Sequence, residues 1–407
     1  MRPSRRFGPR AQAVLQRGLT LIELMIGITM SMLIVLALLT LLINVNRNNT
    51  EMTRTNSVIE NGRFSLQLLE ADLSHAGFWG GFVPTFDDLS VNAAVTTNTF
   101  TVVAFPTALP DPCAAYPADW TLQYKAGLIA IPIQAYSIPS SGTSPVCASL
   151  ITAAQPDTDV LVVRHAAPCP ASATASDMDC QNTAGNVFFQ LSRCATDAAA
   201  YALSATATDL VLNTGTCAAV APTYRFVSTI YWIRRYFLAD GDGIPTLVRS
   251  RFQLVGGVLA HANTETLIEG IEGFRAELGI DKVSKPLVAG GTGTTLTSAS
   301  FLDAVNWASS TTLYTPTNRG DGNADSYIVC SDAAVPCSDP FNLANTVAIR
   351  IDALVRASSK TPGYTTGRTY TVGGTTMGPF TDGYKRHVFS QTVRLNNVSM
   401  RREVPPP

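Results

Sequence analysis

Residues 17–30 read RGLTLIELMIGITM and place a single carboxylate, that of Glu23, near the start of a long apolar run. The run extends from Leu19 to Val45 without a proline, and Glu23 is its only charged residue. At a rise of about 1.5 Å per residue, a helix of this length crosses the roughly 30 Å hydrocarbon core of a bilayer. The stretch therefore predicts a membrane-spanning helix that carries an unexplained acid.

A basic leader precedes the apolar run. It contains five arginines, at positions 2, 5, 6, 10 and 17, and no acid. This distribution predicts that the leader stays in the cytoplasm and that the residues after the helix are exported. An ordinary secretory signal has a short apolar region followed by a small-residue cleavage site. No such site follows here, because the chain continues as a polar helix.

Residues 46–76 continue the helix in amphipathic form. Four apolar residues recur at intervals of seven: Met52, Ile59, Leu66 and Leu73. Leu69 belongs to the same stripe, and Phe64 and Leu68 flank it. Such a pattern predicts one face for a partner surface. Only Gly62 interrupts the segment, so we expect residues 19–45 and 46–76 to form one helix that stops near Gly77.

From residue 77 to about 400 the sequence changes to a β-rich pattern, which we interpret as a globular head. Aromatic and β-branched runs alternate with Gly, Pro, Asn and Asp clusters, as in strands and turns. The predicted strands are Asp159–His165, Val187–Leu191, Tyr224–Leu238, Thr246–Leu254, Thr346–Arg356 and His387–Leu395. The ADGDGIP stretch at 239–245 predicts a hairpin. The fold class is therefore α+β, and residues 401–407 are expected to be a disordered tail.

Eight cysteines lie after the apolar run, and none forms a C-x-x-C pair: Cys113, Cys147, Cys169, Cys180, Cys194, Cys217, Cys330 and Cys337. Their even number predicts disulfides in an oxidising compartment. Six of them fall in residues 85–220, where strands are weaker and loops longer, so we interpret this region as a disulfide-bearing insertion in the head. Pairing of Cys330 with Cys337 and of Cys113 with Cys147 is the simplest assignment, because each pair is isolated in sequence. Free or metal-bound thiols are the alternative.

The charge of the chain argues against general nucleic-acid binding. Without the leader, 24 basic residues (29 less 5) face 30 acidic ones, whereas phosphate neutralisation needs a dense basic patch. Two small basic clusters, Arg234-Arg235 and Arg401-Arg402, either meet DNA or an acidic partner or form a solvated face.

Enzyme motifs are also missing from the sequence, since GGTGTT at 290–295 lacks the lysine of a phosphate loop and the four histidines are dispersed. We therefore expect a protein that is not an enzyme and needs no cofactor.

Two loops alternate oxygen-bearing side chains with glycines. They contain Asp240 and Asp242 in the first loop, and Asp321, Asn323 and Asp325 in the second. Such spacing can wrap a hard cation such as Ca²⁺, although the second loop lacks the closing Glu of an EF-hand. The alternative is a pair of tight turns, in which Asp and Gly serve the backbone.

The junction between Gly18 and the segment LTLIELM resembles the class III signal of type IV prepilins. The resemblance implies that a prepilin peptidase cleaves after Gly18 and that the new first residue, Leu19, is N-methylated. Glu23 then becomes the fifth residue, the hallmark position of that family. It is expected to pair with the new amine of its own or a neighbouring subunit. Leu at the first mature position departs from the usual Phe.

Further motifs narrow the resemblance to the PilW-type minor pilins. In chain order they are AGFWG at 76–80, LIEGIE at 267–272, FRAELGID at 274–281 with Leu278 in the usual Tyr place, GDGNADSY at 320–327, and two closing strands at 347–356 and 386–396. The resemblance covers residues 17–81 and 224–396 in pieces, and it does not cover 85–220.

The resemblance implies a type IV pilin-like fold, with a long N-terminal helix and an antiparallel β-sheet head. It implies a subunit that enters the inner membrane with a periplasmic head and later joins an extracellular pilus. The implied partners are the peptidase, an inner-membrane assembly platform, other minor pilins and the major pilin through the helix, and a large tip adhesin. The implied role is initiation of pilus assembly at the tip, in support of twitching motility, adhesion or DNA uptake. A J-like minor pseudopilin of type II secretion and a tip adhesin module are the alternatives.

Overall fold

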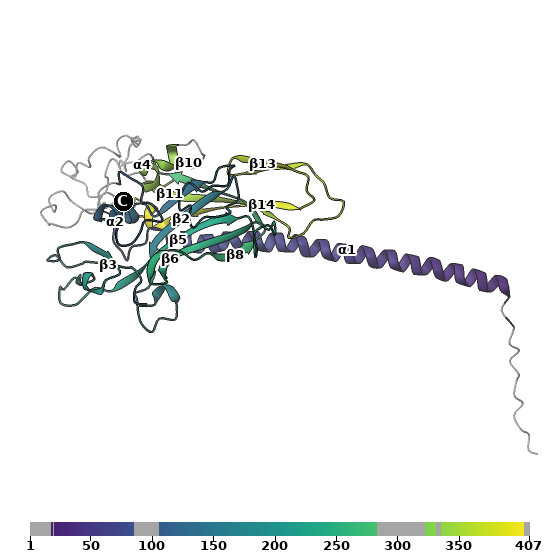
Figure 1. Ribbon diagram of the computed structural model, residues 1–407, viewed down its shortest axis with the longest axis horizontal. Helices are drawn as coiled ribbons and strands as arrows, with labels where there is room; N and C mark the ends of the chain where they lie inside the picture. Colours follow the sequence, from purple (N-terminus) through teal and green to yellow (C-terminus); the bar gives the residue numbers. More distant parts are fainter. Residues whose placement is uncertain (1–17, 19, 85–105, 283–321, 331–334, 403–407) are drawn as a thin grey trace, which may run out of the picture. The chain divides into compact units, whose positions relative to one another are not determined.

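The structure, a computed structural model, describes residues 18, 20–84, 106–282, 322–330 and 335–402 (Figure 1). The chain divides into two compact units, residues 1–54 and residues 55–407. A single helix, α1 (Leu21–Leu73), begins in the first unit and continues without a break into the second. The expected continuity of the apolar and amphipathic segments is thus observed.

The buried face of α1 differs in part from the predicted stripe. Leu66, Leu69 and Leu73 are buried as expected, but Ile59 and Phe64 are exposed. The face instead also includes Val58, Gly62 and Ser65, which recur at intervals of three and four. The prediction missed this face because two of its members, a glycine and a serine, carry no hydrophobic signal.

Gly62 belongs to this face because the helix approaches strand β14 closely there. A Cβ atom at position 62 would overlap the ring of Phe389. The hydroxyl of Ser65 donates to the carbonyl of Gly62 at 2.8 Å, so this side chain turns back to its own helix. Small residues thus seat α1 on the head where larger ones would hold it away.

The larger of two main sheets has eight antiparallel strands. The central strand β5 (Thr223–Arg234) pairs with three others, and the sheet follows the order β1-β2-β5-β3-β4 with β6, β7 and β8 branching from β5 through β6. The other strands are β1 (Ile133–Ser137), β2 (Asp159–Ala166), β3 (Phe188–Leu191), β4 (Tyr201–Ser204), β6 (Thr246–Val255), β7 (Val258–His261) and β8 (Glu265–Glu269). Arg234 opposes Thr246 in the predicted β5–β6 hairpin.

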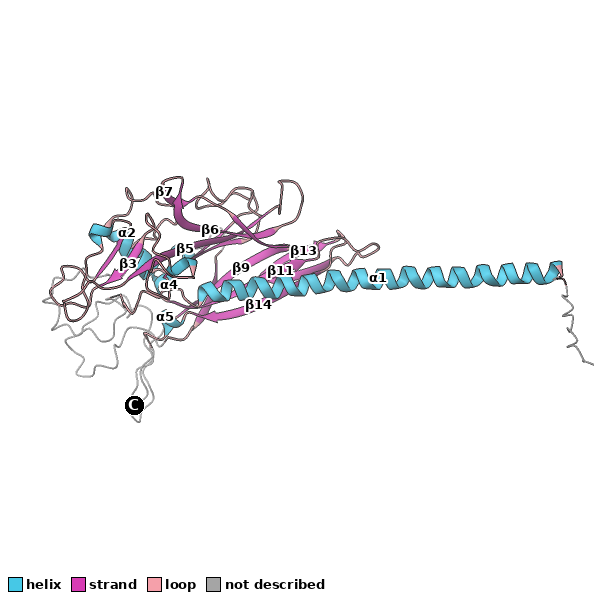
Figure 2. Ribbon diagram, turned by 90° about the horizontal axis from the view of Figure 1, so that it is seen from below, coloured by secondary structure: helices cyan, strands magenta, loops and turns pink. Residues whose placement is uncertain are grey.

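The smaller main sheet has four antiparallel strands in the order β10-β9-β11-β14, and Figure 2 shows β14 beside the head part of α1. Its strands are β9 (Ile271–Ile280), β10 (Ser326–Val329), β11 (Thr346–Arg356) and β14 (Arg386–Arg394). A separate ribbon pairs β12 (Arg368–Val372) with β13 (Thr375–Phe380). Short helices complete the described fold: α2 (Leu122–Ala130), α4 (Pro340–Ala344), α5 (Asn396–Ser399), η3 (Met178–Cys180), η4 (Ala207–Asp209) and η6 (Val335–Ser338).

The cysteine-bearing region is built into the larger sheet. Its strand β2 lies between β1 and β5, with Leu161 opposite Tyr231, and β3 pairs with the first residues of β5. One apolar core cluster contains side chains of α1, α2 and both main sheets, among them Leu69, Leu128, Phe189 and Ile351. The described parts of the head therefore share a core.

The end of the described chain corrects one expectation. Residues 401 and 402 form a turn, and the side chain of Arg402 is buried. Its guanidinium donates to Asn345 Oδ1 at 2.7 Å and to the carbonyl of Ala344 at 2.9 Å. The prediction of a disordered tail from residue 401 is therefore wrong for Arg402, and so is a solvated role for this arginine. Residues 403–407 lie outside the described part.

Candidate functional site

The predicted processing and assembly residues lie at the start of α1. Gly18 is exposed, and a Cβ atom there would meet open space. Leu19, the predicted site of N-methylation, lies outside the described residues. Glu23 lies in the first turn of the helix, and its carboxylate accepts hydrogen bonds from the backbone N–H and the hydroxyl of Thr20, both at 3.0 Å.

Thr20 and Glu23 form a reciprocal cap of the helix. The Glu23 N–H lies 3.3 Å from the Thr20 hydroxyl oxygen, so each side chain accepts from the backbone of the other. This is the S/T-x-x-E capping box, which satisfies backbone donors that a helix N-terminus leaves unpaired. The predicted site residues did not include Thr20, although the sequence TLIE at 20–23 contains the capping-box pattern. The pairing of Glu23 with the amine of a cleaved Leu19 stays a prediction.

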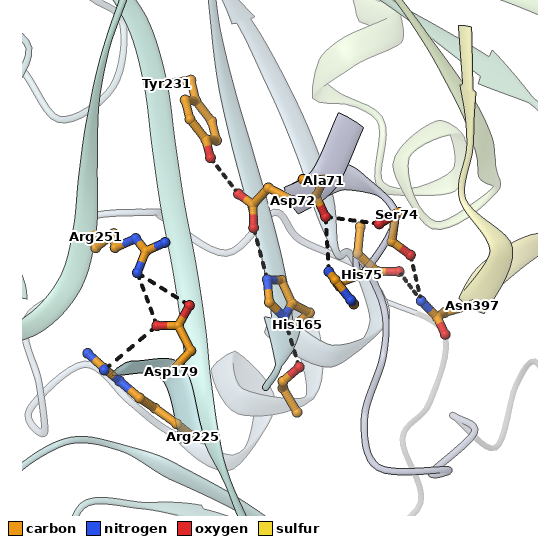
Figure 3. Close-up of polar contacts among 12 residues, drawn as sticks. Ala71, Asp72, Ser74, His75, His165, Asp179, Arg225, Tyr231, Arg251 and Asn397 are labelled. Carbon is orange, nitrogen blue, oxygen red and sulfur yellow. Dashed lines mark hydrogen bonds and ion pairs between the residues drawn. The ribbon is translucent and has the colours of Figure 1, made fainter. Parts of the chain in front are cut away.

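At the other end of α1, a buried polar cluster holds the last turn of the helix against the larger sheet (Figure 3). The carboxylate of Asp72 accepts from His165 Nε2 at 2.9 Å and from the Tyr231 hydroxyl at 2.8 Å. His165 belongs to β2 and Tyr231 to β5, so one acid of the helix binds two adjacent strands. The dispersed positions of these residues in the sequence gave no signal for their convergence.

The cluster favours the charged forms of Asp72 and His165. Burial alone would lower the pKa of His165, but the hydrogen bond and the charge of Asp72 outweigh it and raise that pKa above its ordinary value. Burial likewise opposes the ionised Asp72, yet the contacts with His165 and Tyr231 lower its pKa. Beside them, Asp179 binds Arg251 at 3.0 Å and faces Arg225 at 3.7 Å. An ion pair between Asp72 and His165 therefore holds the last turn of α1 against the larger sheet.

We expect this ion pair to make the stability of the head depend on pH. Because the folded-state pKa of His165 is raised, its contribution is fully present below about pH 6.5 and is lost as the pH rises through the folded value. His165→Gln should cost about 1.5–3 kcal/mol at pH 6 and progressively less at higher pH. Thermal unfolding of both proteins between pH 6 and pH 9 measures this difference. The exposed His387→Gln variant is the control, and a gap between wild type and His165→Gln that does not narrow would contradict the prediction.

The AGFWG motif ends the helix and inserts into the head. The Gly77 N–H donates to the carbonyl of Arg164 at 3.0 Å, and Trp79, which is 1% exposed, donates through Nε1 to the carbonyl of Ile129 at 3.2 Å. From α5, the Asn397 amide reaches the carbonyls of Ser74 and Ala76, at 3.2 and 3.3 Å. The motif thus connects α1 to β2, α2 and the C-terminal helix.

The predicted oxygen-rich loops use described carboxylates to hold the backbone. Asp242 accepts from the N–H groups of Phe237, Leu238, Ala239 and Ile244. In the second loop, Asp325 accepts from the Lys282 N–H at 2.7 Å, Asn323 is exposed, and Asp321 lies outside the described residues. The described parts of the chain contain no cluster of three or more metal-ligating side chains. For Asp242 the structure favours the tight-turn reading, and Ca²⁺ binding by the second loop stays a prediction.

All eight cysteines lie in disulfide pairs. Cys113 pairs with Cys147 and Cys330 with Cys337, as expected from their spacing. The sequence left the other pairings open, and they join Cys169 to Cys180 and Cys194 to Cys217. Each bridge closes a loop of the head, which restricts the unfolded chain more than the folded one.

Comparison with known proteins finds a family model that matches the C-terminal part of the head. Residues 235–397, which contain β6 to β14, match the family model of PilW, the type IV pilus-assembly protein W. No curated protein matches the chain. Among solved structures, a type IV-like pilin from Thermus thermophilus is 10% identical and is matched over 66% of this chain and 85% of its own, at a TM-score of 0.24. The similarity to the PilW family of type IV pilus-assembly proteins therefore covers residues 235–397.

Proposed function

We propose that the chain is a non-catalytic minor pilin that helps to initiate a type IV pilus. It enters the bacterial inner membrane with its head in the periplasm, loses residues 1–18 to a prepilin peptidase, and joins the tip of the filament through α1. Its partners there are other minor pilins and the major pilin. Motility, adhesion or DNA uptake by the assembled pilus follows from this role.

One observation carries the proposal: an uninterrupted helix joins exposed apolar residues to a head that matches the PilW family. The side chains of Leu21 to Val45 are exposed along α1, and the helix continues without a break to Leu73. By length and composition α1 is suited to cross a membrane. Such a surface needs either lipid or apolar partners, and a pilin helix meets lipid first and neighbouring helices later.

Further along α1, Ile59 and Phe64 also remain exposed, at 39% and 55%. They lie outside the face that packs on the head, so they are available to a second helix. Apolar side chains at helical spacing are the usual contact surface between packed helices. This outer face supports helix-to-helix packing as the mode of assembly.

The role of Glu23 provides the test of the proposal. Glu23→Ala should be inserted and cleaved like the wild type, but it should enter sheared pili at least about tenfold less. The reason is that a carboxylate in a dry helical bundle requires a partner charge, which the amine of Leu19 supplies. Immunoblots of whole cells and of sheared pili measure cleavage and incorporation separately.

Gly18→Val serves as the matched control for Glu23→Ala. A side chain at the cleavage position should leave an uncleaved precursor, so this variant fails at the earlier step. Normal incorporation of Glu23→Ala would contradict the assembly role of Glu23. Cleavage of Gly18→Val at the wild-type rate would contradict processing after Gly18.

A further inference from the structure

We propose that the head holds a small carboxylate-type anion, which the guanidinium of Arg164 binds on one face of the larger sheet. Formate is the simplest ligand of this class. Arg164 lies on β2, and its side chain is among the largest fully buried ones of the described residues. The inference concerns the head alone and does not depend on the proposed role in pilus assembly.

Arg164 is a buried cation that lacks the counterion of comparable arginines. The described residues include five buried arginines, which are Arg164, Arg225, Arg275, Arg386 and Arg402. Four of them form an ion pair with an aspartate or a glutamate, whereas Arg164 forms none with any described residue. A guanidinium keeps its proton in proteins, and an ion buried without a partner is costly. The exception therefore calls for a negative charge at Arg164.

The free hydrogen-bonding groups of Arg164 have the geometry of a carboxylate site. Its Nη1 donates to the carbonyl of Ile131, directly after α2, at 3.1 Å. Its Nε and Nη2 are buried, and neither has an acceptor among the described residues. These two nitrogens share one edge of the planar guanidinium, where their N–H bonds point the same way. A carboxylate accepts from such an edge with both oxygens, in two parallel hydrogen bonds.

Two tyrosines near Arg164 do not supply the negative charge. Tyr124 lies on α2 and Tyr136 on β1, and burial raises the pKa of each hydroxyl to about 12, so both are neutral at physiological pH. The Tyr124 hydroxyl donates to the backbone carbonyl of Asp111 at 2.6 Å. The carboxylate of Asp111 accepts from the Cys113 N–H at 2.9 Å in an exposed turn, so it serves its own loop.

On the other side of Arg164, the polar neighbours are uncharged. Ser228 lies opposite Arg164 on β5, and its hydroxyl oxygen is 3.2 Å from Nε2 of His261 on β7. Burial and the charge of Arg164 lower the pKa of His261 to about 3, so this imidazole is neutral. Of these three residues, only Arg164 is charged.

An internal water would serve this layer of the head without balancing its charge. Gln134 on β1 lies on the same face as Arg164, because it pairs with Val162, two residues before Arg164. Its amide nitrogen donates to the Pro110 carbonyl at 3.1 Å and to the Tyr136 oxygen at 2.8 Å. Its Oε1 is buried and has no partner among the described residues, and a water can donate to it. Only an anion neutralises the guanidinium, so the free edge of Arg164 favours an anion.

The burial of Arg164 restricts the ligand to a small ion of single charge. Arg164 is 0% exposed, so a carboxylate of another protein or a lipid headgroup does not reach it while the head is folded. One guanidinium balances one negative charge, which favours a monoanion over sulfate or the phosphate dianion.

Urea unfolding of the full chain in an uncharged detergent tests the proposal. It is measured in sodium formate and in sodium gluconate at equal ionic strength, because gluconate is a carboxylate too large for a closed interior. At a formate concentration ten times its dissociation constant, the equilibrium constant of unfolding should be about elevenfold lower than in gluconate. Broadening of the resonance of ¹³C-labelled formate by the folded protein measures binding independently of unfolding.

Three variants test whether Arg164 is the binding group. Arg164→Met removes the buried charge, so it should fold and should lose the formate response entirely. Arg164→Lys keeps a charge but lacks the edge with two N–H groups, so it should weaken formate binding about tenfold or more. Arg225→Met is the matched control, since Arg225 is a buried arginine of the same sheet with its own carboxylate, that of Asp179 at 3.7 Å. This control should keep the full formate response.

The other outcomes overturn the inference. Equal stability of the wild type in formate and gluconate, without broadening of the formate resonance, would show that water alone serves Arg164. An equal response to chloride would exclude the carboxylate class. A response that persists in Arg164→Met would place the anion elsewhere, and one that is lost in Arg225→Met would reflect general stability. If Arg164→Met does not fold, equal broadening of formate by the wild type and Arg164→Lys would contradict the role of Arg164. Each of these results leaves the proposed minor pilin role intact.

Discussion

Arg275→Met should destabilise the head by about 3–5 kcal/mol at pH 8, one of the two largest effects that we expect from a single substitution. Arg275 lies on β9 of the smaller sheet, and its guanidinium donates to the carboxylate of Asp159 on β2 of the larger sheet at 2.7 Å. It also donates to the hydroxyl of Ser137 on β1 at 2.9 Å. Asp159 is fully buried, so methionine would leave a charge inside the protein without its partner.

The cost of Arg275→Met should depend on pH. Burial raises the pKa of Asp159 to about 6, even though Arg275 and the Ala276 N–H act in the opposite direction. Because the folded-state pKa of Asp159 exceeds the ordinary value, the folded protein binds a proton at a higher pH than the unfolded chain does. The contribution of Asp159 to stability therefore falls as the pH rises from about 4 to about 6. Without Arg275 the carboxyl group should stay protonated to higher pH. The two proteins should therefore differ less at pH 5 than at pH 8.

Urea unfolding of the full chain in detergent, followed by the fluorescence of the buried tryptophans, measures the difference. The double variant Asp159→Asn with Arg275→Met should recover part of the loss, because it removes the buried charge. Arg350→Met is the matched control, since Arg350 pairs with Glu277 at 2.6 Å but is 42% exposed, and such pairs contribute about 1 kcal/mol or less. An equal cost for the two arginines would contradict the inter-sheet role of Arg275.

Patterns that are local in the sequence predicted their elements well. The apolar run, the strands of β2, β5, β6, β11 and β14, and the β5–β6 hairpin depend on short-range periodicity and turn residues, and they lie within a few residues of the expected bounds. Two of the four disulfides followed from spacing alone. In each case the signal and the contact lie close together along the chain.

Contacts between distant segments could not be predicted from the sequence. Asp72 and His165 are separated by 93 positions, and Asp159 and Arg275 by 116. The sequence of an amphipathic helix does not show whether one of its carboxylates faces solvent or a partner residue on a distant strand. The same reason explains Arg402, whose partner Asn345 lies 57 positions earlier.

The LIEGIE motif has a structural meaning that leads to the second large effect. It crosses from one sheet to the other, because β8 of the larger sheet ends at Glu269 and β9 of the smaller sheet begins at Ile271. Between them, Gly270 has a φ of +81°, and its carbonyl accepts from the Arg356 N–H at 2.8 Å. A Cβ atom at this position would lie 2.7 Å from the backbone oxygen of Arg356.

Gly270→Ala should therefore destabilise the head by about 3 kcal/mol or more. A positive φ alone costs a residue with a side chain roughly 1–3 kcal/mol, and the overlap with a backbone carbonyl adds to it because β11 cannot move without disturbing its pairing with β9 and β14.

The turn between β6 and β7 contains a matched control for Gly270→Ala. Gly257 has a φ of +85°, close to that of Gly270, but a Cβ atom there would meet nothing within 4 Å. Gly257→Ala should cost only the conformational part, about 1–2 kcal/mol. The difference between the two variants in urea unfolding measures the close approach of the sheets at Gly270. Equal losses would show that backbone conformation alone requires this glycine, and that the crossing between the sheets has room for a side chain.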